Sequence, residues 1–261
     1  MKKLLIILTI ALLAGCSKEE TLKVAATSVP HAEILEYIQP ILEEDYGINL
    51  EIVVVQDYVT PNQFLDSGDV DANYFQHIPY FDNQVAEFDY DFVNAGGVHI
   101  EPIGVYSNDY ASINDLPNGA TIIFSSSVAD HGRILSLLEL AGLIELDTDN
   151  KLEATINNIS SNPRNFIFKS DIEASLLPTA YANNEGDAII INTNYALQAG
   201  LNPLEDAILL ENEQSPYVNI LAIRSEDEGS EAIEALLEVL TSQIVTDFIN
   251  SNYEGAVVAV H

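Results

Sequence analysis

Short runs rich in β-branched and apolar residues alternate along the chain with longer segments whose apolar positions recur every three or four residues. The short runs predict strands and the longer segments predict helices, because side chains alternate sides in a strand and return every 3.6 residues in a helix. Pro40 lies inside the first predicted helix, where we expect a kink or a break. The predicted strands cover residues 22–27, 50–55, 120–126, 165–170, 187–193 and 219–225, and the predicted helices cover 31–47, 133–144 and 230–253.

Strands and helices that alternate at this spacing indicate an α/β fold with largely parallel sheets. Two longer extended runs, at residues 98–106 and 215–228, predict two crossings between lobes, and ligands of this protein class bind in the cleft at such crossings. We therefore expect residues 22–102 and 220–261 to form one lobe, and residues 103–219 to form the other.

The chain begins with "MKKLLIILTIALLAGC", in which two lysines precede an apolar run that is too short to span a membrane. This pattern predicts a secretion signal over residues 1–15. The stretch "LAGC" resembles the lipobox of bacterial lipoproteins, which implies that Cys16 carries the lipid, palmitate included, and that residues 16–21 are a tether. Because no other cysteine exists, Cys16 has no disulfide partner within the chain. An ordinary signal peptide with an unrelated cysteine is the alternative.

The charge balance excludes some partners. With 9 Lys and Arg against 41 Asp and Glu, the net charge is −32, whereas nucleic acids and anionic lipid surfaces are bound by basic patches. The acidic residues are spread along the chain, which indicates a solvated acidic surface. About 240 residues follow the tether, enough for two lobes.

The stretch "DANYFQHIPYFDN", residues 71–83, concentrates four aromatic residues in a chain without tryptophan. Aromatic clusters occur most often in hydrophobic cores, so core packing is one interpretation. A binding slot for an apolar ligand is the other.

Several segments together resemble the NlpA-type methionine-binding lipoproteins, over residues 22–258. They are "TSVPHAEILEYIQPIL", "DYVTPNQFL", "DANYFQHIPYFDN", "VHIEPIGVYS", "GRILSLLELAGLI", "NTNYALQAGLNP" and "SPYVNILAIR". The resemblance implies a two-lobed periplasmic-binding-protein fold of type II that captures methionine and delivers it to an ABC transporter permease with its ATPase. It implies a monomer, lipid-anchored on the extracytoplasmic face of the cell membrane, with no cofactor and no enzymatic activity. L-Methionine is the expected ligand, with D-methionine or a short methionine peptide as alternatives.

The resemblance also implies the roles of seven side chains. Aromatic and histidine rings of the first lobe would enclose the ligand side chain, an arginine would hold its carboxylate in a paired contact, and two amides would complete the site. These residues are Tyr58, Phe75, His77, Tyr80, Arg133, Asn192 and Asn219.

Arg133 can also be judged from its position. It stands at the start of a predicted helix, where a cation is unfavourable unless an anion holds it. A surface pair between Arg133 and Asp130 is the alternative interpretation. The segment "SSSVADHGR" departs from a run close to "NDPTNEGR" in many relatives, so the identity of the ligand stays open.

A metal-binding protein and an enzyme are the two alternatives to a methionine-binding lipoprotein. His31, His77, His99 and Glu101 could form a zinc or manganese site, which would make the chain a metal-binding importer subunit. No histidine-rich acidic loop accompanies them, however. An enzyme is disfavoured because the chain has no nucleophile elbow, zinc-protease motif or phosphate loop.

Overall fold

The computed structural model describes residues 20–212 and 215–261. Cys16 and the predicted signal segment lie outside the described residues. Within the two described ranges, no helix has the length and apolar character needed to cross a membrane.

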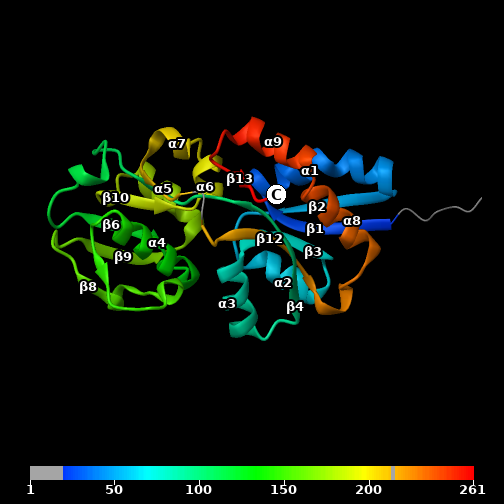
Figure 1. Ribbon diagram of the computed structural model, residues 1–261, viewed down its shortest axis with the longest axis horizontal. Coiled ribbons are helices and arrows are strands. Elements are labelled where there is room, and N and C mark those ends of the chain that lie inside the picture. Colours follow the sequence, from blue (N-terminus) through cyan, green and yellow to red (C-terminus); the bar gives the residue numbers. More distant parts are fainter. Residues whose placement is uncertain (1–19, 213–214) are drawn as a thin grey trace, which may run out of the picture.

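The described chain forms two lobes, each built around its own β-sheet (Figure 1). A small hairpin of β7 (Glu145–Leu146) and β8 (Ile159–Ser161) accompanies the second lobe. The first sheet has the order β13 (Val258–Ala259), β4 (Phe92–Ile100), β12 (Val218–Arg224), β3 (Ala72–His77), β1 (Glu20–Thr27) and β2 (Ile48–Val55). The second has the order β11 (Ala207–Leu210), β5 (Gly104–Tyr106), β10 (Ala188–Ile191), β6 (Thr121–Ser125) and β9 (Ile167–Ile172).

Helices cover both faces of each sheet, so each sheet separates two hydrophobic cores. In the first lobe, α1 (Glu33–Ile41), α8 (Glu231–Leu240) and α9 (Gln243–Tyr253) pack on one face, and α2 (Thr60–Ser67) and α3 (Ile78–Phe88) pack on the other. In the second lobe, α4 (Val128–Leu140) covers one face, and α5 (Leu177–Ala182) and α6 (Thr193–Gln198) cover the opposite one. The short α7 (Pro203–Asp206) precedes β11.

All six predicted strands are present, and the α/β class with two lobes is confirmed. The expectation of largely parallel sheets is only half right. The strands β1, β2 and β3, and likewise β6, β9 and β10, pair in parallel, but β4, β5, β11, β12 and β13 pair antiparallel. The crossing strands pass from one sheet to the other without an intervening helix, so they need not follow the parallel βαβ connection.

The predicted helices have different limits in the structure. After Pro40, the hydrogen-bonding pattern changes to a π-helical segment at Leu42–Tyr46, as expected for a proline inside a helix. The predicted helix at 230–253 is two helices, because the chain breaks at Thr241 and Ser242. Helix α4 begins at Val128, five residues before the predicted start.

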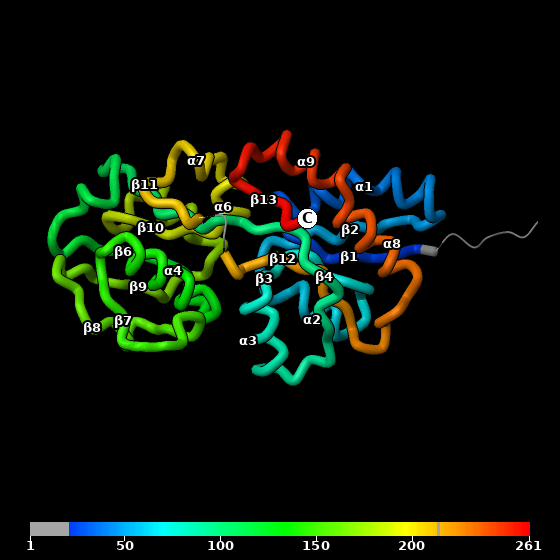
Figure 2. Tube along the Cα trace, in the orientation of Figure 1, coloured from blue at the N-terminus to red at the C-terminus, as the bar shows by residue number. Residues whose placement is uncertain are grey.

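Two connections run between the sheets, as the trace in Figure 2 shows. The first leads from β4 to β5 through residues 101–103, and the second joins β11 to β12. The assignment of residues 22–102 and 220–261 to one lobe, and of 103–219 to the other, stays a prediction.

Candidate functional site

A cavity lies where the two lobes and the two crossings meet. The seven residues that the sequence predicts for the site all line it. Their role in binding stays a prediction, but the fold brings them together from the loop before α2, from β3, α3, α4 and β12, and from the N-cap of α6. The full lining consists of Tyr58, Phe75, Gln76, His77, Tyr80, Glu101, Asp130, Arg133, Asn192, Thr193, Asn194 and Asn219.

The rings of Tyr58, Phe75 and Tyr80 form one wall of the cavity. Their centroids are 5.9 to 6.0 Å apart, and the ring planes are tilted or perpendicular, as is favourable for aromatic side chains. Ala129 of α4 packs against them from the opposite lobe. We call Tyr58, Phe75, His77 and Tyr80 the aromatic wall.

The four aromatic residues of this stretch divide between the cores and the cavity. Tyr74 and Phe81 are buried in the hydrophobic cores on opposite faces of the first sheet. Phe75 and Tyr80 line the cavity instead. The core interpretation is therefore confirmed for Tyr74 and Phe81, and the slot interpretation stays a prediction for Phe75 and Tyr80.

His77 is fixed by the start of α3. It is the N-cap residue, and its Nδ1 accepts a hydrogen bond from the backbone N–H of Tyr80 at 3.1 Å. Its Nε2 then carries the proton and contacts Asp130 Oδ1 of the other lobe, also at 3.1 Å. Both ring nitrogens are thus engaged within the protein, so a hydrogen bond from His77 to a ligand would have to replace the contact with Asp130.

Arg133 lies in the second turn of α4 and not at its start, so the dipole argument made from the sequence was wrong. The alternative of a surface pair with Asp130 is wrong as well. Arg133 is only 5% exposed, and Glu211 is its partner, with Oε2 at 2.8 Å from Nε and 2.5 Å from Nη2. Burial alone would lower the pKa of Arg133, but the charge and hydrogen bond of Glu211, together with Asp130 and Tyr217, raise it.

Gly132 lets this part of α4 lie against the backbone of Leu152, and Tyr217 packs on the Arg133 side chain. Gly132 allows a close approach, because a Cβ there would stand 2.2 Å from the backbone oxygen of Leu152. The Tyr217 ring lies under the guanidinium, 4.8 Å from its carbon, and Nη2 also donates to the Glu101 carbonyl. Among the described residues, none accepts a hydrogen bond from Nη1.

Asp130 is 1% exposed and contacts both lobes. Oδ1 accepts from His77, and Oδ2 accepts from Asn192 Nδ2 at 3.2 Å and from the Ser125 hydroxyl at 3.4 Å. Burial alone would raise the pKa of Asp130, but the hydrogen bond and charge of His77, together with Arg133, lower it. The carboxylate is therefore ionised at neutral pH.

The two predicted amides lie at the ends of strands that face the cavity. Asn192 follows β10 and begins α6, and its Oδ1 is buried without a hydrogen-bond partner among the described residues. Asn219 lies in β12, where its Oδ1 receives the Nε2–H of His31 at 3.2 Å.

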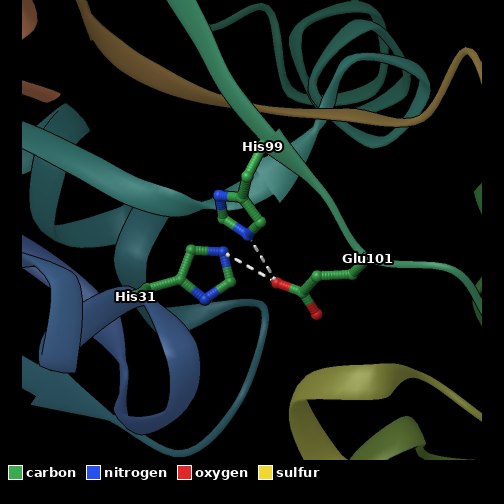
Figure 3. Close-up of side chains that lie close together, drawn as sticks. All are labelled: His31, His99 and Glu101. Carbon is green, nitrogen blue, oxygen red and sulfur yellow. Dashed lines mark hydrogen bonds and ion pairs between the residues drawn. The ribbon is translucent and has the colours of Figure 1, made fainter. Parts of the chain in front are cut away.

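Behind the cavity, His31, His99 and Glu101 form a buried cluster (Figure 3). Glu101 Oε1 lies 2.9 Å from His99 Nε2 and 3.3 Å from His31 Nε2, while Oε2 accepts the backbone N–H of Asn194 at 2.9 Å. Burial lowers the pKa of His31 to about 4 and that of His99 to about 3, and burial raises the pKa of Glu101. Both imidazoles are neutral at pH 7.

The proposed four-residue metal set is not assembled, because His77 contacts Asp130 and lies outside this cluster. In the three-residue remainder, each Nδ1 is hydrogen-bonded to a hydroxyl, that of Thr27 for His31 and that of Tyr74 for His99. Each Nε2 contacts Glu101. The cluster is therefore a satisfied hydrogen-bond network, and a metal ion would have to displace protons from it.

The sequence did not predict several lining residues. Gln76, Thr193 and Asn194 stand beside predicted ones in "FQHIPY" and "NTNY", so adjacency was the available signal. Glu211, the partner of Arg133, lies in a segment that has no distinguishing motif, and only the fold reveals it.

Comparisons with known proteins find relatives over nearly the whole chain. Residues 22–261 match the family described as NlpA lipoprotein. The methionine-binding lipoprotein MetQ of Bacillus subtilis is 47% identical over 274 residues, which cover 100% of this chain and 99% of that protein. A pheromone cOB1 precursor/lipoprotein of Enterococcus faecalis superposes with a TM-score of 0.90 at 49% identity, covering 92% of this chain and 100% of the other. A nutrient binding protein of Burkholderia cenocepacia, bound to methionine, superposes with a TM-score of 0.87 at 39% identity, covering 92% and 100%.

Proposed function

Because the chain belongs to the NlpA lipoprotein family, we propose that it is an extracytoplasmic binding protein that captures methionine and delivers it to an ABC permease with its ATPase. It is a binding lipoprotein of this family and not an enzyme. The metal-binding alternative is disfavoured, since the histidines that suggested it are occupied by hydrogen bonds.

One observation carries this proposal: a single cavity combines a slot lined by aromatic rings with a buried guanidinium. A thioether is polarizable and makes favourable contacts with ring edges, worth roughly 0.3–1.5 kcal/mol each. The carboxylate of an amino acid requires a cation, and Arg133 is the cation that lines the cavity. Methionine matches both features.

The geometry refines the expected contact with the carboxylate. Glu211 occupies the Nε and Nη2 edge of Arg133, and the Glu101 carbonyl takes Nη2 as well. A ligand carboxylate would then accept from Nη1, a single nitrogen, in place of the paired contact expected from the sequence.

Calorimetry with the purified chain tests the proposed function. We expect L-methionine to bind, L-norleucine to bind about 10-fold more weakly because a methylene replaces the sulfur, and L-glutamine to bind weakest because the slot is apolar. D-Methionine and a methionine dipeptide measured alongside would define the preferred form. Mass spectrometry of a small molecule released on unfolding gives an independent answer. A chain that binds none of the methionine compounds would contradict the proposal.

The location is part of the same proposal. We infer a lipid anchor on Cys16 that holds one copy of the chain at the outer face of the cell membrane. Cys16→Ala should move the protein from the membrane fraction to the soluble fraction and leave methionine binding unchanged. A variant that stays wholly in the membrane fraction would rule out this anchor.

A further inference from the structure

The charges around the cavity are unevenly matched. Among the described residues that line it or contact its lining, Arg133 is the one guanidinium, whereas three buried or nearly buried carboxylates belong to Glu101, Asp130 and Glu211. A site built mainly to attract an anion would show the opposite balance. The three carboxylates differ in whether groups of the protein already engage them.

Two of the three carboxylates are already engaged. Glu211 neutralises Arg133 and is itself held by the backbone N–H of Ile103 at 3.2 Å and the Ser215 hydroxyl at 3.0 Å. Glu101 accepts from His99 through Oε1, which also lies 3.3 Å from His31 Nε2, and from the Asn194 backbone through Oε2. Neither carboxylate is left to meet a charge on a ligand.

Asp130 is different, because its three hydrogen bonds leave room for a further donor at a carboxylate with about four acceptor positions. Asn192, which is hydrogen-bonded to Asp130, also has an acceptor available for a ligand donor. Asn192 donates its Nδ2 to Asp130, which leaves its own Oδ1 buried, unpartnered among the described residues and part of the cavity lining. Such an orphan acceptor costs free energy unless a ligand donor satisfies it.

We propose that Asp130 and the Oδ1 of Asn192 bind the protonated amine of the ligand, so that a free amine is the main polar requirement of this cleft. This inference rests on the proposed function and specifies which end of the amino acid the site selects. A buried carboxylate, with an amide oxygen next to it, is the arrangement that an ammonium group with three donors needs. The acidic Asp130 therefore makes this cleft selective for amine-bearing ligands.

The test compares two ligands with the same methylthio chain and carboxylate: L-methionine, which carries the amine, and 4-(methylthio)butanoate, which lacks it. Calorimetry on the wild-type chain should show a preference for L-methionine on the order of 100-fold, as expected for a desolvated charge pair. In Asp130→Asn, which keeps the size of the side chain, the preference should shrink to about 10-fold or less. Affinity for 4-(methylthio)butanoate should be unchanged or improved.

Two further variants complete the design. Asp66→Asn removes one negative charge from an exposed position and should keep the full preference. Asn192→Val removes the orphan acceptor and should weaken L-methionine by about 10-fold while leaving 4-(methylthio)butanoate unaffected. This second variant decides the matter if Asp130→Asn fails to fold, which thermal unfolding reports.

The outcomes separate the possible explanations. If Asp130 only positions His77 and Asn192, its substitution weakens both ligands equally, and the inference is wrong. If a variant of Asp130 or Asn192 keeps the wild-type preference, the inference is wrong while methionine binding by the wild type still supports the proposed function. If the wild type binds no amine-bearing compound, the proposed function fails and the inference fails with it.

Discussion

The two walls of the cleft are built differently. Three members of the aromatic wall, Phe75, His77 and Tyr80, come from six consecutive residues that end β3 and begin α3. The opposite wall, which we call the polar wall, takes Asp130 and Arg133 from α4 and Asn192 and Asn194 from the start of α6. Most of the aromatic wall therefore comes from one short stretch of sequence, whereas the polar wall is brought together by the fold.

The difference affects what each wall can do. In the proposed function, the aromatic wall would bind by burial and ring contacts, and these tolerate changes of ligand shape. The polar wall would bind through buried charges, each of which needs a specific partner, as Arg133 has in Glu211. We therefore expect removal of a charged partner to be more damaging than removal of a ring.

The largest effect is expected at Arg133. Arg133→Ala should abolish detectable binding of L-methionine in calorimetry, and it should also lower the free energy of unfolding by about 3–5 kcal/mol because Glu211 is left buried and unpaired. Arg133→Lys should rescue binding only partly, since an ammonium cannot serve Glu211, the Glu101 carbonyl and a ligand in the same geometry.

A double variant separates the two effects. Arg133→Met combined with Glu211→Leu removes both charges, so unfolding in urea should return to within about 2 kcal/mol of wild type while binding stays lost. If Arg133→Ala binds L-methionine within a few-fold of wild type, the carboxylate site lies elsewhere.

A smaller effect is expected on the aromatic wall. Phe75→Ala should weaken L-methionine about 100-fold, close to 3 kcal/mol, because one side of the slot is lost. Phe81→Ala is the matched control: this ring is buried in a core beside α3, so its removal should cost about 3–5 kcal/mol of stability and leave the affinity of the folded protein unchanged. Reversed results for the two variants would mean that Phe75 is the core residue.

The contrast between the walls explains how far the sequence could predict the site. The strands and the α/β class follow from local patterns, whereas the aromatic wall was implied by the resemblance to the NlpA family, in which Phe75 and Tyr80 belong to one motif. The start of α4 was misplaced because residues 128–132, "VADHG", carry little apolar periodicity, and the error moved Arg133 to a helix end.

The partners of the polar wall could not be predicted, for a physical reason. Glu211 lies 78 positions from Arg133, and His77 lies 53 positions from Asp130. Nothing in either local sequence selects one carboxylate among 41 acidic residues. Such pairs are determined by how the lobes close, and only a three-dimensional structure gives that information.

The smallest effect is expected behind the cavity, at the buried cluster of His31, His99 and Glu101. An unfolded histidine has a pKa near 6.5, whereas burial holds the pKa of His31 at about 4 and that of His99 at about 3. Above pH 6.5 both states are neutral and the stability is complete. As the pH falls below 6.5, the unfolded chain takes up protons that the folded chain cannot, so stability is lost down to the folded pKa values. The raised pKa of Glu101 acts in the opposite direction and offsets part of this loss.

Comparison with a variant isolates the contribution of one histidine from that of the acidic surface. Between pH 6 and pH 5, the free energy of unfolding of the wild type should fall by about 1 kcal/mol more than that of His99→Gln, because one unit of pH is worth about 1.4 kcal/mol per proton and Glu101 offsets part of it. His261→Gln, which changes an exposed histidine, should follow the wild type. Urea unfolding at a series of pH values measures all three. If the wild type and His99→Gln keep a constant difference across this range, His99 is protonated in the folded chain. The buried cluster of His31, His99 and Glu101 would then carry a charge that its hydrogen bonds do not predict.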